Sequence, residues 1–291
     1  MVYTTHKLPC HYVDYLCKPG LKTRGGIVPL QMYMGKHKNG KNSEDFLGAL
    51  FGANLRDLDD PSWTPASCVP TEELVIMVKG QGNDVYYVQL WDWIWDNQEQ
   101  LGSSKNAYLQ YIYKNYFVEK AGGPNPLYGM VKDAYFGNEC IGFVSNYLRY
   151  IGFWKKYQGV DNHYWYIHFA TPVLNLEDVR PLDLLEWTDV GHVALVDDVE
   201  GVTDGTLKLD VSQCSRLGDL KDPMSNKGVF LKQATKQEGN GGHTKYTLSG
   251  NAPVPGDLQI RRNLDLQYAS PCYPYTPLEY PAAADRVELR K

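Results

Sequence analysis

The sequence predicts an α+β protein in which a cysteine-bearing helix packs on an antiparallel β-sheet, preceded by an N-terminal extension. Three observations carry this prediction. Residues 136–153 have apolar side chains at helical spacing, residues 193–248 contain short β-rich runs separated by turns, and residues 121–126 (AGGPNP) interrupt the chain before both. With 291 residues, 43% of them hydrophobic, the chain is long enough to bury a full core.

The break at residues 121–126 predicts an N-terminal region over residues 1–120, whose fold the sequence leaves open, and a core over residues 121–291. Helices are expected at residues 43–55, where a serine can cap the first turn, and at residues 107–120, where apolar residues recur at helical spacing.

Two further segments of the N-terminal region are apolar but fit either a strand or a helix. They are residues 72–79 and residues 85–95. In the second segment Trp91, Trp93 and Trp95 either line a carbohydrate groove or, as is more common, pack in the core.

The central helix is predicted from Ile141, Val144, Leu148 and Ile151, which recur at helical spacing. Cys140 then lies in the first turn. The unpaired backbone N–H groups and the positive end of the helix dipole favour a thiolate at this position. The alternative is that Cys140 is a small packed hydrophobic residue.

Four β-rich runs follow this helix and predict the antiparallel sheet. His192 directly precedes the first run and follows a glycine, so it stands at a strand end from which a side chain can reach a helix N-terminus. It is equally compatible with an ordinary histidine at a strand edge. Residues 250–291 are rich in proline and are expected to wrap the surface as a C-terminal extension of the core. The four runs are residues 193–199, 206–211, 228–233 and 245–248.

A cysteine-bearing helix followed by an antiparallel sheet is the order of elements in a papain-like core. Four segments resemble, in order, the motifs of the bacterial cell-wall cysteine peptidases of the NlpC type, and more loosely those of the related CHAP amidases. Aspartate, serine and glycine are usual in that family where this chain has Glu139, Ile141 and Leu182, and the paired glycines after the tyrosine are missing. The four segments are LYG (127–129), NECIGFVSNYLRYIGF (138–153), RPLDLLEW (180–187) and GHVALVDDV (191–199).

The resemblance implies a role for each matching residue. Cys140 is the nucleophile, His192 the general base, and Tyr128 a hydroxyl on the oxyanion side. The third catalytic residue in that family is a polar residue on the next strand. Matching the segment VSQCS to the family places Gln213 in this role, whereas strand alternation also allows Asp210. An amide orients an imidazole as well as a carboxylate does, so both alternatives remain.

The function that the resemblance implies is a cysteine amidase or endopeptidase that hydrolyses an amide bond in peptidoglycan stem peptides. Its substrate is peptidoglycan or a muropeptide, and no cofactor and no metal site are expected. Two alternatives remain open. One is a catalytically inactive papain-fold binding module, and the other is an acyltransferase or deamidase that uses the same Cys140 and His192.

Composition limits the partners. The formal net charge is −5, with 29 basic and 34 acidic residues spread without long runs of one sign, which argues against nucleic acid as the main partner. No run of 18 apolar residues predicts a membrane span. The six cysteines show no metal-site spacing, and free thiols are expected.

The first residues lack the apolar stretch of a signal peptide, so we expect synthesis in the cytoplasm without Sec export. A wall hydrolase of this kind would reach the cell wall or periplasm by another route, as a phage lysin or an injected antibacterial effector. The implied partners are then an immunity protein, a secretion machine or a phage component.

Overall fold

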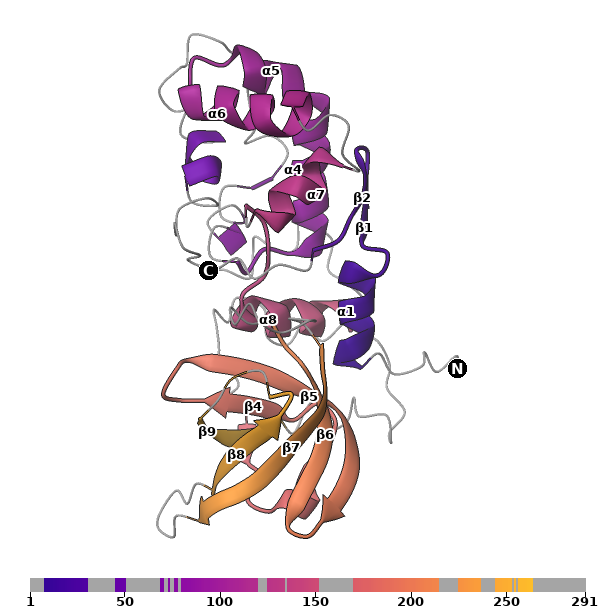
Figure 1. The fold of residues 1–291 in the computed structure, drawn as a ribbon, viewed down its shortest axis with the longest axis vertical. Helices are drawn as coiled ribbons and strands as arrows, with labels where there is room; N and C mark the ends of the chain where they lie inside the picture. The colour runs from indigo at the N-terminus through magenta and orange to yellow at the C-terminus, as the bar shows by residue number, and fades with distance from the viewer. Residues whose placement is uncertain are drawn as a thin grey trace. The chain divides into compact units, whose positions relative to one another are not determined.

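The computed structural model describes residues 8–30, 45–50, 69–70, 73, 76–77, 80–119, 125–133, 135–151, 170–214, 225–236, 244–252, 254 and 256–263 (Figure 1). The chain forms two compact units. We call Asp14–Gly142 the helical unit, and Met1–Val13 with Phe143–Lys291 the sheet unit. The predicted boundary near residue 120 falls on residues 120–124, which lie outside the described residues, so the division into 1–120 and 121–291 stays a prediction.

The helical unit contains a short antiparallel hairpin and a series of helices. Three of its helices begin at an asparagine whose side-chain oxygen accepts a hydrogen bond from a backbone N–H of the first turn, at Asn83, Asn106 and Asn125. The elements are β1 (Leu21–Thr23), β2 (Gly26–Val28), α4 (Asp84–Asp96), α5 (Gln98–Ser103), α6 (Ala107–Ile112), the π-helix η2 (Tyr113–Glu119) and α7 (Pro126–Lys132). The N-terminal helix α1 (Pro9–Cys17) ends in this unit.

The two ambiguous segments of this unit are helical where the structure describes them. Residues 85–95 lie within α4, and residues 73, 76 and 77 are also helical. In α4 only Trp91 of the three tryptophans is fully buried, because residues two apart on a helix point in different directions. The predicted helix at 107–120 is confirmed, but its second half widens into η2.

Helix α8 (Cys140–Tyr150) confirms the predicted central helix and places Cys140 at its first position. The helix begins in the helical unit and continues into the sheet unit. In the sheet unit, Tyr12 of α1 packs on this helix, with its ring centroid 5.6 Å from that of Phe143 and 6.2 Å from that of Tyr147. No helix of the described residues is long and apolar enough to cross a membrane.

The sheet unit is a seven-stranded sheet in which every pairing is antiparallel (Figure 1). The strand order is β3-β9-β4-β5-β6-β7-β8, and β9 also pairs with β8, so six strands close into a barrel. The predicted α+β class with an antiparallel sheet is therefore confirmed. The strands are β3 (Ala170–Pro172), β4 (Leu184–Trp187), β5 (His192–Thr203), β6 (Thr206–Ser212), β7 (Ser225–Lys236), β8 (Thr244–Gly250) and β9 (Asp257–Asn263), with the 3-10 helix η4 (Leu176–Asp178) between β3 and β4.

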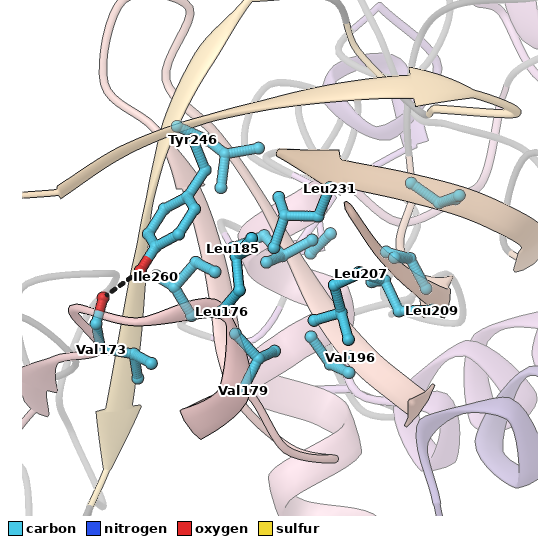
Figure 2. Packing of buried hydrophobic residues seen from close by; sticks show 14 of the residues in the cluster. Val173, Leu176, Val179, Leu185, Val196, Leu207, Leu209, Leu231, Tyr246 and Ile260 are labelled. Atoms are coloured by element: carbon cyan, nitrogen blue, oxygen red, sulfur yellow. Dashed lines mark hydrogen bonds between the residues drawn. The ribbon is translucent and has the colours of Figure 1, made fainter. Parts of the chain in front are cut away.

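The core of the sheet unit lies on the inner face of the barrel (Figure 2). Alternate residues of each strand enter it, such as Leu207, Leu209 and Val211 of β6, because successive side chains of a strand point to opposite faces. Tyr246 reaches across this core and donates its hydroxyl to the Val173 carbonyl at 2.8 Å. That bond satisfies a polar group which would otherwise be costly to bury.

Two arginines of β9 fasten this strand to the segment around β4. The Arg262 guanidinium donates to both carboxylate oxygens of Asp183, at 2.8 and 2.7 Å, and Arg261 pairs with Glu186. Both carboxylates are almost fully buried. The sequence analysis did not predict β9, because its residues lie in the stretch that the prolines marked as a surface wrap.

Candidate active site

Cys140 is buried, with 6% of its surface exposed, and opens helix α8. The helix start is packed tightly against the turn at residues 80–82. An added Cβ at Gly142 would lie 2.1 Å from the Gly80 carbonyl oxygen and 2.8 Å from the Gln81 Cα, so only glycine fits. The glycine two residues after Cys140 therefore has a packing role at the helix start.

Hydrogen bonds join the same turn to the residue before the cysteine. The Glu139 N–H donates to the Gly80 carbonyl at 2.8 Å, and the Gln81 side-chain amide donates to the Glu139 carboxylate. The sequence analysis did not single out Gln81, because 58 residues separate it from Glu139 along the chain. The glycines on both sides of Gln81 were its only local signal.

His192 is the first residue of β5 and is 7% exposed. It pairs with Trp187 of β4, and the two ring centroids are 5.2 Å apart. The register of β5 and β6, with Leu195 opposite Ser212, puts Gln213 next to Ala194 on the same face as His192. The Gln213 side chain is fully buried and lies close enough to His192 to raise its pKa. The structure thus brings two of the predicted site residues together.

Burial lowers the pKa of His192 to about 4, and the neighbouring Gln213 side chain opposes this shift. The imidazole is therefore neutral near pH 7. A neutral imidazole is able to accept a proton, which is what a general base must do. This state differs from a permanent thiolate–imidazolium pair, in which the histidine already carries the proton.

Two further predicted residues, Asp210 and Tyr128, have contacts of their own. Asp210 has the opposite orientation on β6, and its carboxylate accepts the Gly228 N–H at 2.9 Å, so it joins β6 to β7. Tyr128 lies on α7, is half-buried, and its ring centroid is 4.5 Å from the Lys132 Nζ. Cys140 belongs to the helical unit and His192 to the sheet unit, so the pairing of thiol and imidazole stays a prediction.

Asp197 is another buried titratable group of the sheet unit, and no motif in the sequence marks it. It is 2% exposed, accepts the Cys10 N–H at 2.6 Å, and accepts a hydrogen bond from the Ser212 hydroxyl. Its carboxylate thus caps the start of α1, where the helix dipole favours negative charge. Burial nevertheless raises the pKa of Asp197 to about 6, and Ser212 and Cys10 oppose that rise.

His192 and Asp197 are expected to make the free energy of unfolding depend on pH in opposite directions. The pKa of His192 falls from 6.5 to about 4 on folding, so the unfolded chain binds more protons, and stability increases by about 3 kcal/mol between pH 4 and 6.5. The pKa of Asp197 rises from 3.8 to about 6, so the folded chain binds more protons, and stability decreases by about 3 kcal/mol between pH 4 and 6.

The contributions of His192 and Asp197 to the pH dependence of stability nearly cancel in the wild type. Substitution of one residue leaves the contribution of the other visible. Urea unfolding between pH 4 and 7 should show stability rising with pH in Asp197→Asn and falling with pH in His192→Gln, each relative to the wild type. Slopes unchanged from the wild type in both variants would contradict the assignment of these pKa values to burial.

Two more findings complete the description of the site. Among the described residues, no three histidine, cysteine, aspartate or glutamate side chains are grouped so that they could hold a metal ion. Comparison with known proteins gives no match to any family model, curated protein or solved structure.

Proposed function

We propose that this protein is a cysteine amidase or endopeptidase with a papain-like core that hydrolyses an amide bond in peptidoglycan stem peptides. The observation that carries the proposal is the buried imidazole of His192, which is neutral near pH 7 and lies beside the buried Gln213 side chain. A general base held by an orienting amide is the partner that a cysteine nucleophile requires. Cys140, at the start of a tightly packed helix, is the nucleophile of the proposed reaction.

Two backbone features support the resemblance to the NlpC-type motifs. Leu182 has φ +74°, which is a conformation that favours glycine, and glycine is the usual residue at this place in that family. Gly142 corresponds to the glycine of the family's cysteine helix, and the approach of Gly80 explains why it is needed. A backbone conformation that favours glycine at the first position and a glycine at the second are what the proposed resemblance would require.

The proposed reaction begins when His192 accepts the Cys140 proton as the sulfur attacks the carbonyl carbon of the scissile amide. The carbonyl oxygen becomes an oxyanion, which the Cys140 backbone N–H and the Tyr128 hydroxyl stabilise, each donor contributing about 3 kcal/mol. His192 then returns the proton to the leaving amine, and a thioester remains. Water, deprotonated by His192, attacks the thioester and releases the carboxylic acid and the Cys140 thiol.

Analysis of the products tests this proposal. Purified peptidoglycan and defined muropeptides are incubated with the protein, and the products are identified by mass spectrometry. We expect fragments that differ from the substrate by one added water at a single amide bond. Protein whose cysteines have been blocked with iodoacetamide is the control and should give no product. Absence of any cleavage by the untreated protein would overturn the proposal.

The departures at Glu139 and Ile141 favour a second candidate, a binding module that has the fold but not the reaction. The two candidates differ in the reactivity of Cys140 towards iodoacetamide at pH 6. A catalytic thiol should react faster than free cysteine, whereas a packed and inert thiol should react more slowly. The product analysis would recognise an acyltransferase by transfer of the acyl group to an amine instead of water. It would recognise a deamidase by release of ammonia.

The proposed site of action is the cell wall or periplasm, where the protein would act as a phage lysin or an injected antibacterial effector. In the second case we propose an immunity protein as a partner. Expression of the protein in the periplasm rather than the cytoplasm of a bacterial host should then cause lysis. Equal growth in both cases would exclude this site of action.

A further inference from the structure

The turn at residues 80–82 is built to hold one side chain against the start of α8. Gly80 has φ +74°, and its N–H donates to the Met77 carbonyl at 2.9 Å. The Gln81 N–H donates to the Ile76 carbonyl at 3.0 Å. An added Cβ at Gly82 would lie 2.3 Å from the Met77 side chain. The backbone on both sides of Gln81 is therefore fixed, and its side chain has a defined direction.

That side chain binds the residue that precedes the predicted nucleophile. The Gln81 Nε2 donates to the Glu139 Oε1, while the Glu139 N–H donates to the Gly80 carbonyl. Glu139 stands directly before the first residue of α8, at the position of the helix N-cap. An acidic side chain at this position ordinarily turns towards the N–H groups of the first turn. Here Gln81 holds one carboxylate oxygen on the turn instead.

The place of this carboxylate matters for a thiol one residue away. A negative charge close to a thiol disfavours the thiolate and raises its pKa. The first-turn N–H groups have no acceptor within the helix, and a carboxylate bound to them would compete with the oxyanion of a substrate. Restraint of the Glu139 carboxylate on the turn would therefore favour the reaction.

We propose that Gln81 is a positioning residue for the Cys140 thiol. It holds the Glu139 carboxylate on the turn at residues 80–82. The negative charge then does not contact the Cys140 sulfur or the N–H groups of the first turn. The residues of this arrangement all belong to the helical unit. The inference rests on the proposed function, because it assumes that the Cys140 sulfur, as it loses its proton, is the attacking atom.

The pH profile of Cys140 alkylation tests the role of Gln81. The full-length protein is treated with iodoacetamide at pH values from 5 to 9, and the modified Cys140 peptide is quantified by mass spectrometry. Gln81→Met keeps the length of the side chain but removes the hydrogen bond. We expect the midpoint of its profile to move to higher pH, with about tenfold slower alkylation at pH 6, as one pKa unit requires.

A second substitution shows whether the effect passes through the carboxylate. Glu139→Gln should alkylate within about twofold of the wild type, and Gln81→Met with Glu139→Gln should do the same, because the double variant has no charge to restrain. Gln110→Met is the matched control, because Gln110 is an exposed glutamine of α6 whose amide bonds to the Ser104 carbonyl. Its profile should match that of the wild type. The thermal midpoint of each variant is measured alongside.

Two results would overturn the inference. One is a Gln81→Met profile that coincides with the wild type. The other is a shift that persists in the double variant, which would show that Gln81 acts on the thiol without the Glu139 charge. Failure of the proposed function is a separate outcome, because it appears as absence of peptidoglycan cleavage by the wild type. The alkylation profiles are measured whether or not cleavage occurs.

Discussion

Replacement of Cys140 by alanine is expected to lower the rate of peptidoglycan hydrolysis by at least about 10⁴-fold. The sulfur is the atom that forms the thioester in the proposed reaction, and no other described group can take its place at the start of α8. The imidazole of His192 and the oxyanion donors would remain. Without the sulfur they could assist only the direct attack of water on the amide. Release of fragments from purified peptidoglycan measures the rate.

Cys17→Ala provides the matched control for this variant. Cys17 is another cysteine of the helical unit, at the end of α1, and has no part in the proposed reaction. Its variant should keep the wild-type rate. Because alanine is smaller than cysteine and suits a helix, Cys140→Ala itself should unfold within a few degrees of the wild type. Undiminished hydrolysis by a folded Cys140→Ala protein would exclude Cys140 as the nucleophile.

Replacement of Gly142 by alanine is expected to lower the free energy of unfolding by about 2 kcal/mol or more. The added Cβ would meet the Gly80 carbonyl oxygen at 2.1 Å and the Gln81 Cα at 2.8 Å, well inside the roughly 3.5 Å of a favourable contact. Both obstacles are backbone atoms, so the turn must move away. The hydrogen bond from the Glu139 N–H to the Gly80 carbonyl is then lost as well. Alanine's better helix propensity returns only about 1 kcal/mol.

Gly48→Ala is the control with the opposite sign. Gly48 is an exposed glycine in the helical residues 45–50, and nothing lies within 4 Å of the place where its Cβ would be. Alanine should therefore stabilise the protein by up to about 1 kcal/mol. Urea unfolding at pH 7 measures both variants. A Gly142→Ala protein as stable as Gly48→Ala would contradict the close approach of the turn at residues 80–82 to α8.

Local patterns in the sequence predicted much of the secondary structure. The apolar spacing around Val144 and Leu148 predicted α8, and the four β-rich runs correspond to β5, β6, β7 and β8. These predictions succeed because one face of a helix or strand is buried, and the period of its apolar residues follows from its geometry. The same signal could not separate strand from helix at residues 85–95, since the apolar residues there are not confined to the buried face of α4; Val85, for example, is exposed.

The candidate site was predicted in part. The residue types and the places of Cys140 and His192 at the ends of their elements followed from the sequence, but the choice between Gln213 and Asp210 did not. The sheet register puts Gln213 on the face of His192 and turns Asp210 towards Gly228, and the role of Gln213 as the third catalytic residue stays a prediction. The low pKa of His192 was also not predictable, because it depends on how deeply the ring is buried.

The sequence by itself determined the α+β class, the cysteine-bearing helix and most of the antiparallel strands. Tertiary structure alone decided that β9 closes the sheet into a barrel, that Asp197 caps α1, and that Gln81 binds Glu139. The physical reason is the range of the interactions. Periodicity and turn chemistry depend on neighbouring residues, whereas strand closure and side-chain pairing join residues far apart in the chain, and only the packing of the whole unit brings them into contact.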